Sequence, residues 1–375
     1  MGRVSSKVVK STKRALGKAT ERQVLRFVNG LVMFMDGSRP QMGNAQKDIV
    51  MQHGKVSLAR LRPRNDVALE LGHDTVTIER GRFPTPVLLI PPLMVRPYVY
   101  DLRPEHSMAR TLRDRGYDVF ILDFGVPDRE DQGLRLDDYV LDFVPRAVDA
   151  ALASSGAARI TLAGYCMGGI FALLHTAAHR DDRVRNIVTI GAPINFEKMG
   201  MLTLSARLGA RHVDKLLDRV GNVPAAAAIQ GFKLMSGTKA LTKYADLFLR
   251  LHDEEYVRGF DAINTWVNDL LPYPRDAFKQ MVKDVVSGNK LLRSQLVFGD
   301  KTADLTTIRQ PLLAFAGASD NVAAPASTRD ILELVGSTDK RLYEVPGGHV
   351  GVVAGGAAPA KVWRPMADWL APRSV

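Results

Sequence analysis

Residues 160–169 read ITLAGYCMGG and place Cys166, the single cysteine among 375 residues, between two glycines. The spacing Gly164-Tyr-Cys-Met-Gly168 matches G-x-S-x-G, a sharp strand-to-helix turn that exposes a nucleophile, with sulfur in place of oxygen. Glycine suits both flanking positions because the turn packs backbone against backbone and leaves no room for a Cβ atom. The pattern predicts that Cys166 is a nucleophile. The alternative is a buried structural cysteine, since free cysteine is among the most buried residue types.

A nucleophile of this kind is followed in the chain by an acid and then by a base. Asp320 comes after the apolar run 311–317, and His349 comes after the strand-like run 341–345 in a glycine-rich loop. Each of the three residues therefore lies at the carboxyl end of an expected strand, where open α/β sheets place their active sites. We expect Cys166, Asp320 and His349 to form a catalytic triad.

Other acids and histidines fit these roles less well. Asp300 and Asp304 flank a turn, which is typical of surface residues. His175 and His179 lie four residues apart on the helix expected after Cys166, where a packed or solvated helix face explains them. Asp123 follows a strand-like run but precedes the nucleophile, so its order is wrong for the acid.

The expected chemistry is nucleophilic acyl transfer. Only the thiolate attacks, and a free cysteine with a pKa of about 8.5 needs a base at neutral pH. His349 would take the proton, and Asp320 would orient His349. The oxyanion needs two convergent donors. We expect the backbone N–H of Met167, next to the nucleophile, and that of Met94 in the loop after 86–91.

Sulfur suits an acyl group that arrives as a thioester. A thiol that accepts it forms another thioester, so the first step is nearly thermoneutral and the stored free energy is kept for a second transfer. This favours an acyltransferase or a polymerising enzyme. A cysteine-dependent hydrolase, such as a thioesterase or a polyester depolymerase, is the alternative.

The elements that must position these residues alternate along the chain. Residues 75–80 alternate with period two, and short dense apolar runs are typical of strands buried on both faces: 86–91, 117–123, 159–164, 186–192 and 311–317. Helical stretches such as 107–116 and 138–156 separate them. The alternation predicts an α/β fold with a mostly parallel central sheet and helices on both faces.

Three regions are expected. Residues 1–65 would form a basic helical arm, with helical apolar spacing over 20–35, and a Gly-, Pro-, Asn- and Arg-rich connector over 36–65. Residues 66–200 and 301–375 would form the core. Residues 201–300 carry apolar residues at helical spacing without β-rich runs, which predicts an inserted helical cap.

Composition narrows the function classes. The chain is 46% hydrophobic and 24% charged, as in an ordinary globular protein. The single cysteine excludes an intramolecular disulfide and fits a reducing cytoplasm, and no metal-site spacing is present. No apolar run reaches the length of about 18 residues that a membrane span needs. We expect a cytoplasmic enzyme without a metal or a cofactor.

The amino terminus is strongly basic. Residues 1–26 carry eight Lys and Arg against one acid, and the net charge of the chain is +11. The arm is either simply solvated or attracted to an anionic surface or polyanionic ligand. Nucleic acid is not expected, because no recognised binding motif accompanies the charge. A catalytically weak protein that binds a granule or membrane through this arm is a further alternative.

Beyond these patterns, the chain resembles polyhydroxyalkanoate synthases, specifically the shorter catalytic subunits of the two-subunit classes, over residues 66–372. The family's elbow G-x-C-x-G-G is matched by 164–169. Further matching segments are 96–128, WVNDLLPYPRDAFKQMV at 266–282 and GHVGVV at 348–353. The resemblance implies an α/β-hydrolase fold, in which the central sheet is mostly parallel and a helical cap is inserted.

The resemblance also implies roles and partners. Cys166 would carry the growing acyl chain, His349 would be its base, and Asp320 would assist the histidine or activate the incoming 3-hydroxyl group. The implied substrate is an (R)-3-hydroxyacyl-CoA, the product is a polyester with free CoA, and CoA enters as part of the substrate rather than as a cofactor. Granule surfaces, an accessory synthase subunit and a second copy of the chain are the candidate partners.

Two positions depart from the family pattern. Asn195 stands where the family usually has Asp, and Val95 stands where Asn is common in the oxyanion loop. The departures leave open a different acyl substrate or a loss of polymerising activity.

Overall fold

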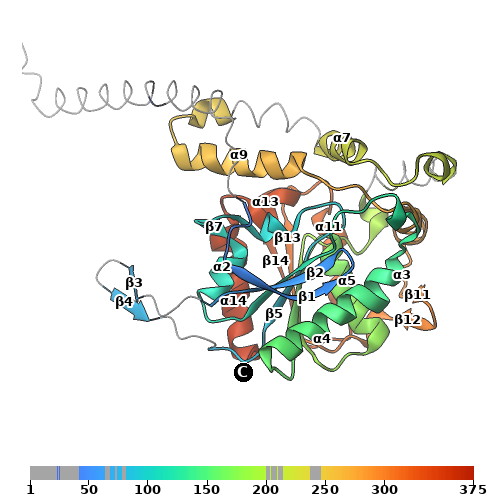
Figure 1. Cartoon of the computed structure of the whole chain (residues 1–375), viewed down its shortest axis with the longest axis horizontal. Coiled ribbons are helices and arrows are strands. Elements are labelled where there is room, and N and C mark those ends of the chain that lie inside the picture. The colour runs from blue at the N-terminus through green and yellow to red at the C-terminus, as the bar shows by residue number, and fades with distance from the viewer. Residues whose placement is uncertain are drawn as a thin grey trace, which may run out of the picture.

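The central element of the protein is an eight-stranded sheet with the order β1-β2-β8-β5-β9-β10-β13-β14 (Figure 1). The computed structural model describes residues 42–63, 68–71, 74–77, 82–199, 214–236 and 246–375, with positions 23, 25, 203 and 209. The strands from β8 to β14 run parallel, whereas β2 pairs antiparallel with both β1 and β8. The predicted mostly parallel α/β sheet is confirmed.

The dense apolar runs form the parallel strands. They are β5 (Val87–Ile90), β8 (Val119–Asp123), β9 (Ile160–Tyr165), β10 (Val184–Ile190), β13 (Leu312–Gly317) and β14 (Lys340–Val345). Every residue of β5, β9 and β13 is buried. Burial on both faces is why these strands lack the polar alternation of a half-exposed sheet.

The prediction that residues 36–65 form a connector is wrong. Residues of that stretch form β1 (Lys47–His53) and β2 (Val56–Leu61), which pair as a hairpin and extend the central sheet. Strand β2 buries Val56, Leu58 and Leu61, so the core begins well before residue 66. The run predicted over 75–80 contributes β4 (Asp74–Thr77), which pairs only with β3 (Ala68–Leu71) outside the main sheet; residues 78–80 lie outside the described part of the chain.

Helices cover both faces of the sheet and enclose two apolar clusters (Figure 1). Helices α4 (Val144–Ser155) and α5 (Met167–His179) pack over one face, and α2 (Met108–Arg113) and α14 (Arg364–Leu370) pack over the other. Strand β5 supplies both clusters, because Leu88 and Ile90 face one side and Val87 and Leu89 the other.

The stretch predicted as a helical cap is divided. Helices α7 (Ala225–Ser236) and α9 (Glu254–Asn268) lie above the end of the sheet that bears α11 (Pro325–Arg329) and α13 (His349–Ala354) (Figure 1). The later part, α10 (Arg275–Gln280), the π-helical Met281–Ser287 and the hairpin β11 (Leu296–Phe298) with β12 (Lys301–Ala303), contributes buried side chains to the main core. The expectation that residues 201–300 contain no strand is therefore wrong at β11.

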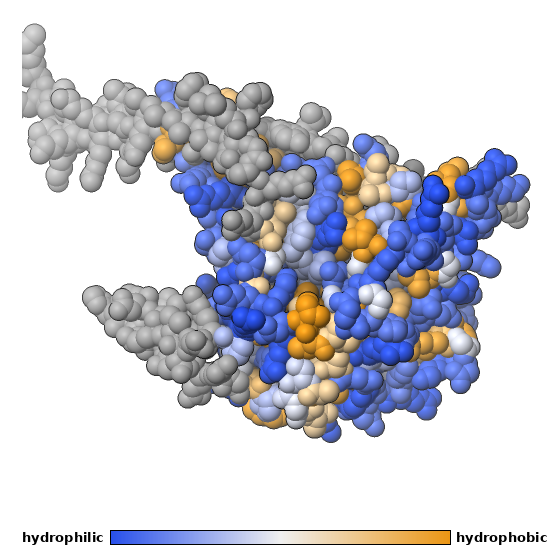
Figure 2. All heavy atoms as spheres, in the orientation of Figure 1, coloured by the Kyte–Doolittle hydropathy of each residue, from blue (hydrophilic) through white to orange (hydrophobic). Residues whose placement is uncertain are grey.

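The described surface is mostly hydrophilic, with small separate apolar areas on the face drawn in Figure 2. Of the helix predicted over 20–35, only Gln23 and Leu25 are described, and both are helical. The rest of the basic arm lies outside the described residues. In the described chain, no helix is both long and apolar enough to cross a membrane.

Candidate active site

Cys166 occupies the turn between β9 and α5 in a backbone conformation that L-residues rarely adopt, with φ 52° and ψ −120°. Its N–H donates to the carbonyl of Ile190 at 2.8 Å, which ties the turn to the neighbouring strand β10. The strained backbone is thus held by the sheet, and the cysteine stands at the start of a thirteen-residue helix.

The glycines on either side are required by close backbone contacts. A Cβ atom on Gly164 would lie 2.2 Å from the carbonyl carbon of Gly168. One on Gly168 would lie 1.9 Å from the carbonyl oxygen of Ile90, at the end of β5. Both distances are far below van der Waals contact, so the elbow pattern is dictated by packing as the spacing predicts.

His349 and Asp320 meet in the loops after β14 and β13. The Nδ1 atom of His349 lies 2.8 Å from Oδ2 of Asp320, and both side chains are buried. The other Asp320 oxygen accepts the N–H groups of Val322 and Ala323, each at 2.8 Å. With these bonds to a carboxylate, the Nδ1 proton of His349 donates to Asp320 and the ring is fixed in one orientation.

The structure brings Cys166 to the same histidine, and the two side chains share a hydrogen bond. Because Nδ1 is occupied by Asp320, Nε2 faces the sulfur. Burial by itself lowers the pKa of His349, but the charges of Cys166 and Asp320 and their hydrogen bonds outweigh it and raise this pKa to about 10. The raised pKa keeps the imidazole of His349 protonated through neutral pH, beside the side chain of Cys166.

The two expected oxyanion donors lie beyond the carboxyl ends of two neighbouring strands. Met167 is the first residue of α5, directly after Cys166, and Met94 lies in the loop that follows β5. Strands β5 and β9 pair in parallel with Ile90 opposite Gly164. Their carboxyl ends, and the loops that follow them, therefore lie side by side at one edge of the sheet. The Met94 carbonyl accepts the N–H of Leu271 at 2.8 Å, which orients that peptide.

Two tyrosines that sequence reasoning missed support this arrangement. The Tyr100 hydroxyl donates to the Ile90 carbonyl at 2.6 Å and accepts the N–H of Tyr165 at 3.0 Å. The Tyr165 hydroxyl in turn donates to the His349 carbonyl at 3.2 Å. Burial raises the pKa of both phenols, which keeps them neutral. Tyr165 stands inside the elbow motif, but Tyr100 lies 65 residues away from it and carries no local signal.

A segment of the cap is bonded to the loop after β5. The indole N–H of Trp266 donates to the Arg96 carbonyl at 3.2 Å, and the Tyr98 hydroxyl donates to Asp269 at 2.6 Å. Together with the bond from Leu271 to Met94, these contacts join residues 266–271 to residues 94–98. We call this set of contacts the cap strap.

Two of the competing acids and both competing histidines have structural partners. Asp123 accepts the N–H of Gly125 at 2.8 Å, and Asp304 accepts the N–H of Thr306 at 3.0 Å. His175 faces Asp181 at 3.2 Å, far along α5 from the nucleophile, and His179 lies 3.0 Å from the Val140 carbonyl.

Asn195 also has a structural explanation. Its amide donates to Asp330 at 2.6 Å, and its oxygen accepts the amide of the fully buried Asn289 at 3.0 Å. An aspartate here would place a second carboxylate against Asp330, so the amide is the complementary group. The other departure, Val95, packs against the apolar cluster of α2 and α14.

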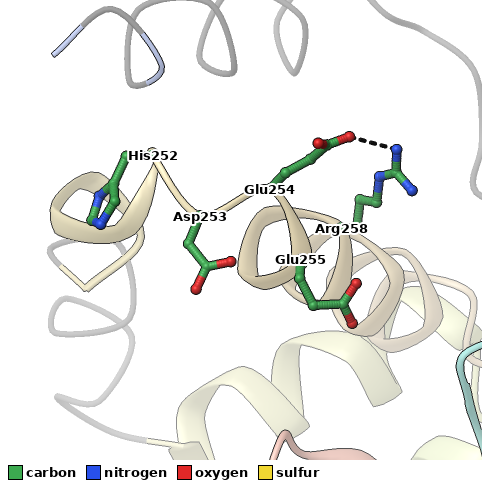
Figure 3. A pocket seen from close by; sticks show the side chains of 5 residues that line it. All are labelled: His252, Asp253, Glu254, Glu255 and Arg258. Atoms are coloured by element: carbon green, nitrogen blue, oxygen red, sulfur yellow. Dashed lines mark hydrogen bonds and ion pairs between the residues drawn. The ribbon is translucent and has the colours of Figure 1, made fainter. Parts of the chain in front are cut away.

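A hollow at the start of α9 contains none of the predicted site residues. His252, Asp253, Glu254, Glu255 and Arg258 line it, and Arg258 pairs with Glu254 at 2.5 Å (Figure 3). Its lining is mostly exposed and acidic. Among the described residues, no group of three or more His, Cys, Asp or Glu could hold a metal ion.

Comparisons with known proteins point to one family. The profile of the alpha/beta hydrolase fold matches residues 98–353. The chain is 30% identical over 341 residues to the poly(3-hydroxyalkanoate) polymerase subunit PhaC of Haloferax mediterranei, with 90% of this chain but only 66% of that protein covered. It is 32% identical to the subunit of Allochromatium vinosum (76% and 81% covered) and 30% identical to that of Synechocystis (93% and 90% covered).

Solved structures agree on the fold. A soluble variant of monoglyceride lipase from Saccharomyces cerevisiae aligns with a TM-score of 0.55, with 90% of this chain and 99% of that chain covered. At 15% identity, this likeness establishes the α/β-hydrolase architecture alone.

Proposed function

Because the chain belongs to the poly(3-hydroxyalkanoate) polymerase (PhaC) family of the α/β-hydrolase superfamily, we propose that it polymerises the acyl groups of (R)-3-hydroxyacyl-CoA into polyhydroxyalkanoate. The observation that carries the proposal is a cysteine in a strained elbow, hydrogen-bonded to a buried His349–Asp320 pair. A thiol in this position accepts an acyl group from a thioester at little cost in free energy.

The geometry supports the following acylation step. The Cys166 thiolate attacks the thioester carbonyl carbon, a new C–S bond forms, and the C–S bond to CoA breaks. His349 gives its Nε2 proton to the departing CoA sulfur, and Asp320 holds the imidazole through Nδ1. The N–H groups of Met94 and Met167 stabilise the oxyanion in between.

Chain growth reuses the same residues. His349 takes the proton of the 3-hydroxyl group of an incoming acyl unit, and that oxygen attacks the carbonyl carbon held on Cys166. A C–O ester bond forms, the C–S bond breaks, and the Cys166 thiolate and the protonated His349 are restored for the next acylation. The reaction needs no cofactor, because CoA enters as part of the substrate.

The proposed partners follow from charge and from the family. The net charge of +11 suits the polyanionic CoA and an anionic granule surface in the cytoplasm. The relatives are named as subunits, which supports an accessory synthase subunit as a partner, next to a second copy of this chain.

The test is incubation of the purified protein with (R)-3-hydroxybutyryl-CoA, following CoA release with a thiol reagent and the product by mass. Wild type should release CoA and form oligomeric esters. Cys166→Ala should lower the rate of CoA release at least about a thousandfold, because it removes the nucleophile.

The products separate the alternatives. Free 3-hydroxybutyrate without oligomers would identify a cysteine hydrolase instead. CoA release and ester formation that persist unchanged in Cys166→Ala would exclude the covalent mechanism. The assay is repeated with longer acyl chains and with a candidate accessory subunit before inactivity is concluded.

A further inference from the structure

The hydroxyl of Tyr273 is buried without a hydrogen-bond partner among the described residues. The side chain is 5% exposed. A buried hydroxyl that makes no hydrogen bond destabilises the folded protein, so such a group in a native structure needs an explanation. Phenylalanine would fill the same space without burying an unbonded hydroxyl, so packing alone does not explain the oxygen atom.

The position of Tyr273 is well fixed. Its N–H and carbonyl pair with those of Val223 at 3.0 and 2.9 Å, and its ring packs edge-on against Phe278 with centroids 5.3 Å apart. Two residues earlier, Leu271 is bonded to Met94 through the cap strap. The segment that carries Tyr273 is therefore anchored to the oxyanion loop, and its ring belongs to the same apolar cluster against which Met94 packs.

The hydroxyl also lies within electrostatic reach of the nucleophile. Burial raises the pKa of Tyr273, and the charges of Tyr139 and Cys166 raise it further. The phenol is consequently neutral at every working pH, with one proton to donate.

The remaining question is which substrate atom lacks a donor. In the proposed function, the carbonyl oxygen of the acyl group already faces the N–H groups of Met94 and Met167. A 3-hydroxyacyl group has one more oxygen, at carbon 3, and a plain acyl group has none there. That oxygen accepts a hydrogen bond both as a free hydroxyl and as the ester oxygen of the chain.

We infer that the Tyr273 hydroxyl donates a hydrogen bond to the 3-oxygen of the acyl group carried on Cys166, and so selects 3-hydroxyacyl over plain acyl thioesters. The inference rests on the proposed function. It makes Tyr273 a specificity-determining residue supplied by the segment that follows α9, and it gives the buried hydroxyl a partner in the substrate.

The test compares Tyr273→Phe with wild type on (R)-3-hydroxybutyryl-CoA and on butyryl-CoA, which lacks the 3-oxygen. Acylation of Cys166 is measured in single turnovers by the mass of the intact protein. Tyr273→Phe should slow acylation by the hydroxy substrate about five- to tenfold, as expected for one neutral hydrogen bond, and leave butyryl-CoA unaffected. Since it removes an unpartnered buried hydroxyl, it should also unfold at the same or a higher temperature.

Tyr343→Phe is the matched control. Tyr343 lies on β14 and stacks on Phe315 with centroids 5.5 Å apart, and the change should alter acylation by neither substrate. Equal slowing of both substrates by Tyr273→Phe, or no slowing of either, would overturn the inference while the proposed function stands. Failure of folded wild type to be acylated by either substrate would overturn the proposed function, and the inference with it.

Discussion

Cys166, His349 and Asp320 form a chain of hydrogen bonds in which each member depends on the next. Asp320 is held by two backbone N–H groups, so its carboxylate cannot turn away from the imidazole. Burial opposes a charged imidazole, and the charges of Cys166 and Asp320 together with their hydrogen bonds keep the pKa of His349 raised. At the residue scale, the protonation state of the site is thus set by Asp320 and Cys166 together.

Asp320→Asn should lower the pKa of His349. In wild type the imidazolium is retained through neutral pH and is lost as pH rises through about 10, because this pKa is raised. The variant lacks one of the charges that raise it, so His349 should lose its proton at a lower pH. The measurement is an NMR titration of the ¹⁵N-labelled imidazole rings.

The Cys166→Ala variant serves as the comparison, since it removes the other flanking charge and should also lower the pKa of His349. A titration midpoint that is the same in Asp320→Asn as in wild type would show that the carboxylate does not control the imidazole.

At the element scale, the hairpin β1–β2 shows why an edge strand is not predicted from its sequence pattern. Strand β1 is exposed along most of its length, and β2 carries the polar residues Ser57 and Arg60 among apolar ones. The Arg60 guanidinium pairs with Asp118 at 2.7 Å and donates to the Ser154 carbonyl at 2.7 Å, so its charge is not buried in the core. Strand β2 supplies fully buried side chains to the core, whereas Val50 and Met51 of β1 pack against it only partly buried, so the hairpin contributes to stability mainly through β2.

Leu58→Ala and Ile49→Ala should differ strongly in their effect on stability. Leu58 on β2 is fully buried, whereas Ile49 on β1 is 58% exposed. Leu58→Ala should lower the free energy of unfolding by about 2–5 kcal/mol, and Ile49→Ala by about 0.5 kcal/mol or less. Denaturant unfolding followed by circular dichroism measures both, and equal small losses would show that residues 47–61 are the peripheral connector that the sequence predicts.

At the scale of the whole molecule, the cap strap connects the inserted helices to the oxyanion loop. Helix α9 ends at Asn268, and the next three residues reach Tyr98 and Met94 through Asp269 and Leu271. Movement of the cap would therefore displace the Met94 peptide, which is bonded to it. Since Tyr273 follows directly, the same segment brings the inferred donor to the acyl group.

Asp269→Ala should lower the rate of CoA release about threefold or more, because the oxyanion loop loses the Tyr98 bond and the ion pair that Asp269 forms with Arg96 at 3.4 Å. The loss of stability should stay below about 1 kcal/mol, since the Asp269 side chain is 46% exposed. Steady-state kinetics and thermal unfolding separate the two effects.

Asp276→Ala is the control for this change. Asp276 pairs with its neighbour Arg275 on α10, outside the cap strap, and its removal should leave the rate unchanged. Equal rate losses in both variants would show that the strap does not act on the oxyanion loop.

The sequence by itself determined the parallel strands, the elbow, and the order of Cys166, Asp320 and His349, because these depend on local features. A strand buried on both faces is a dense apolar run, and a turn with two close backbone contacts needs two glycines, wherever the rest of the chain lies. The same reasoning placed the two oxyanion donors after β5 and β9, on strands that prove to be neighbours.

Only the tertiary structure decided what depends on contacts between distant residues. Strands β1 and β2 gain their place by pairing with each other and with β8, and the apolar residues after Tyr273 pack into the main core although their helical spacing resembles that of a separate cap. The roles of Tyr100 and Asn195 likewise depend on partners far away in the chain. Only the fold buries the Tyr273 hydroxyl without a hydrogen-bond partner among the described residues. A local pattern shows whether a side chain is apolar, but the residues that contact it are set by the tertiary fold.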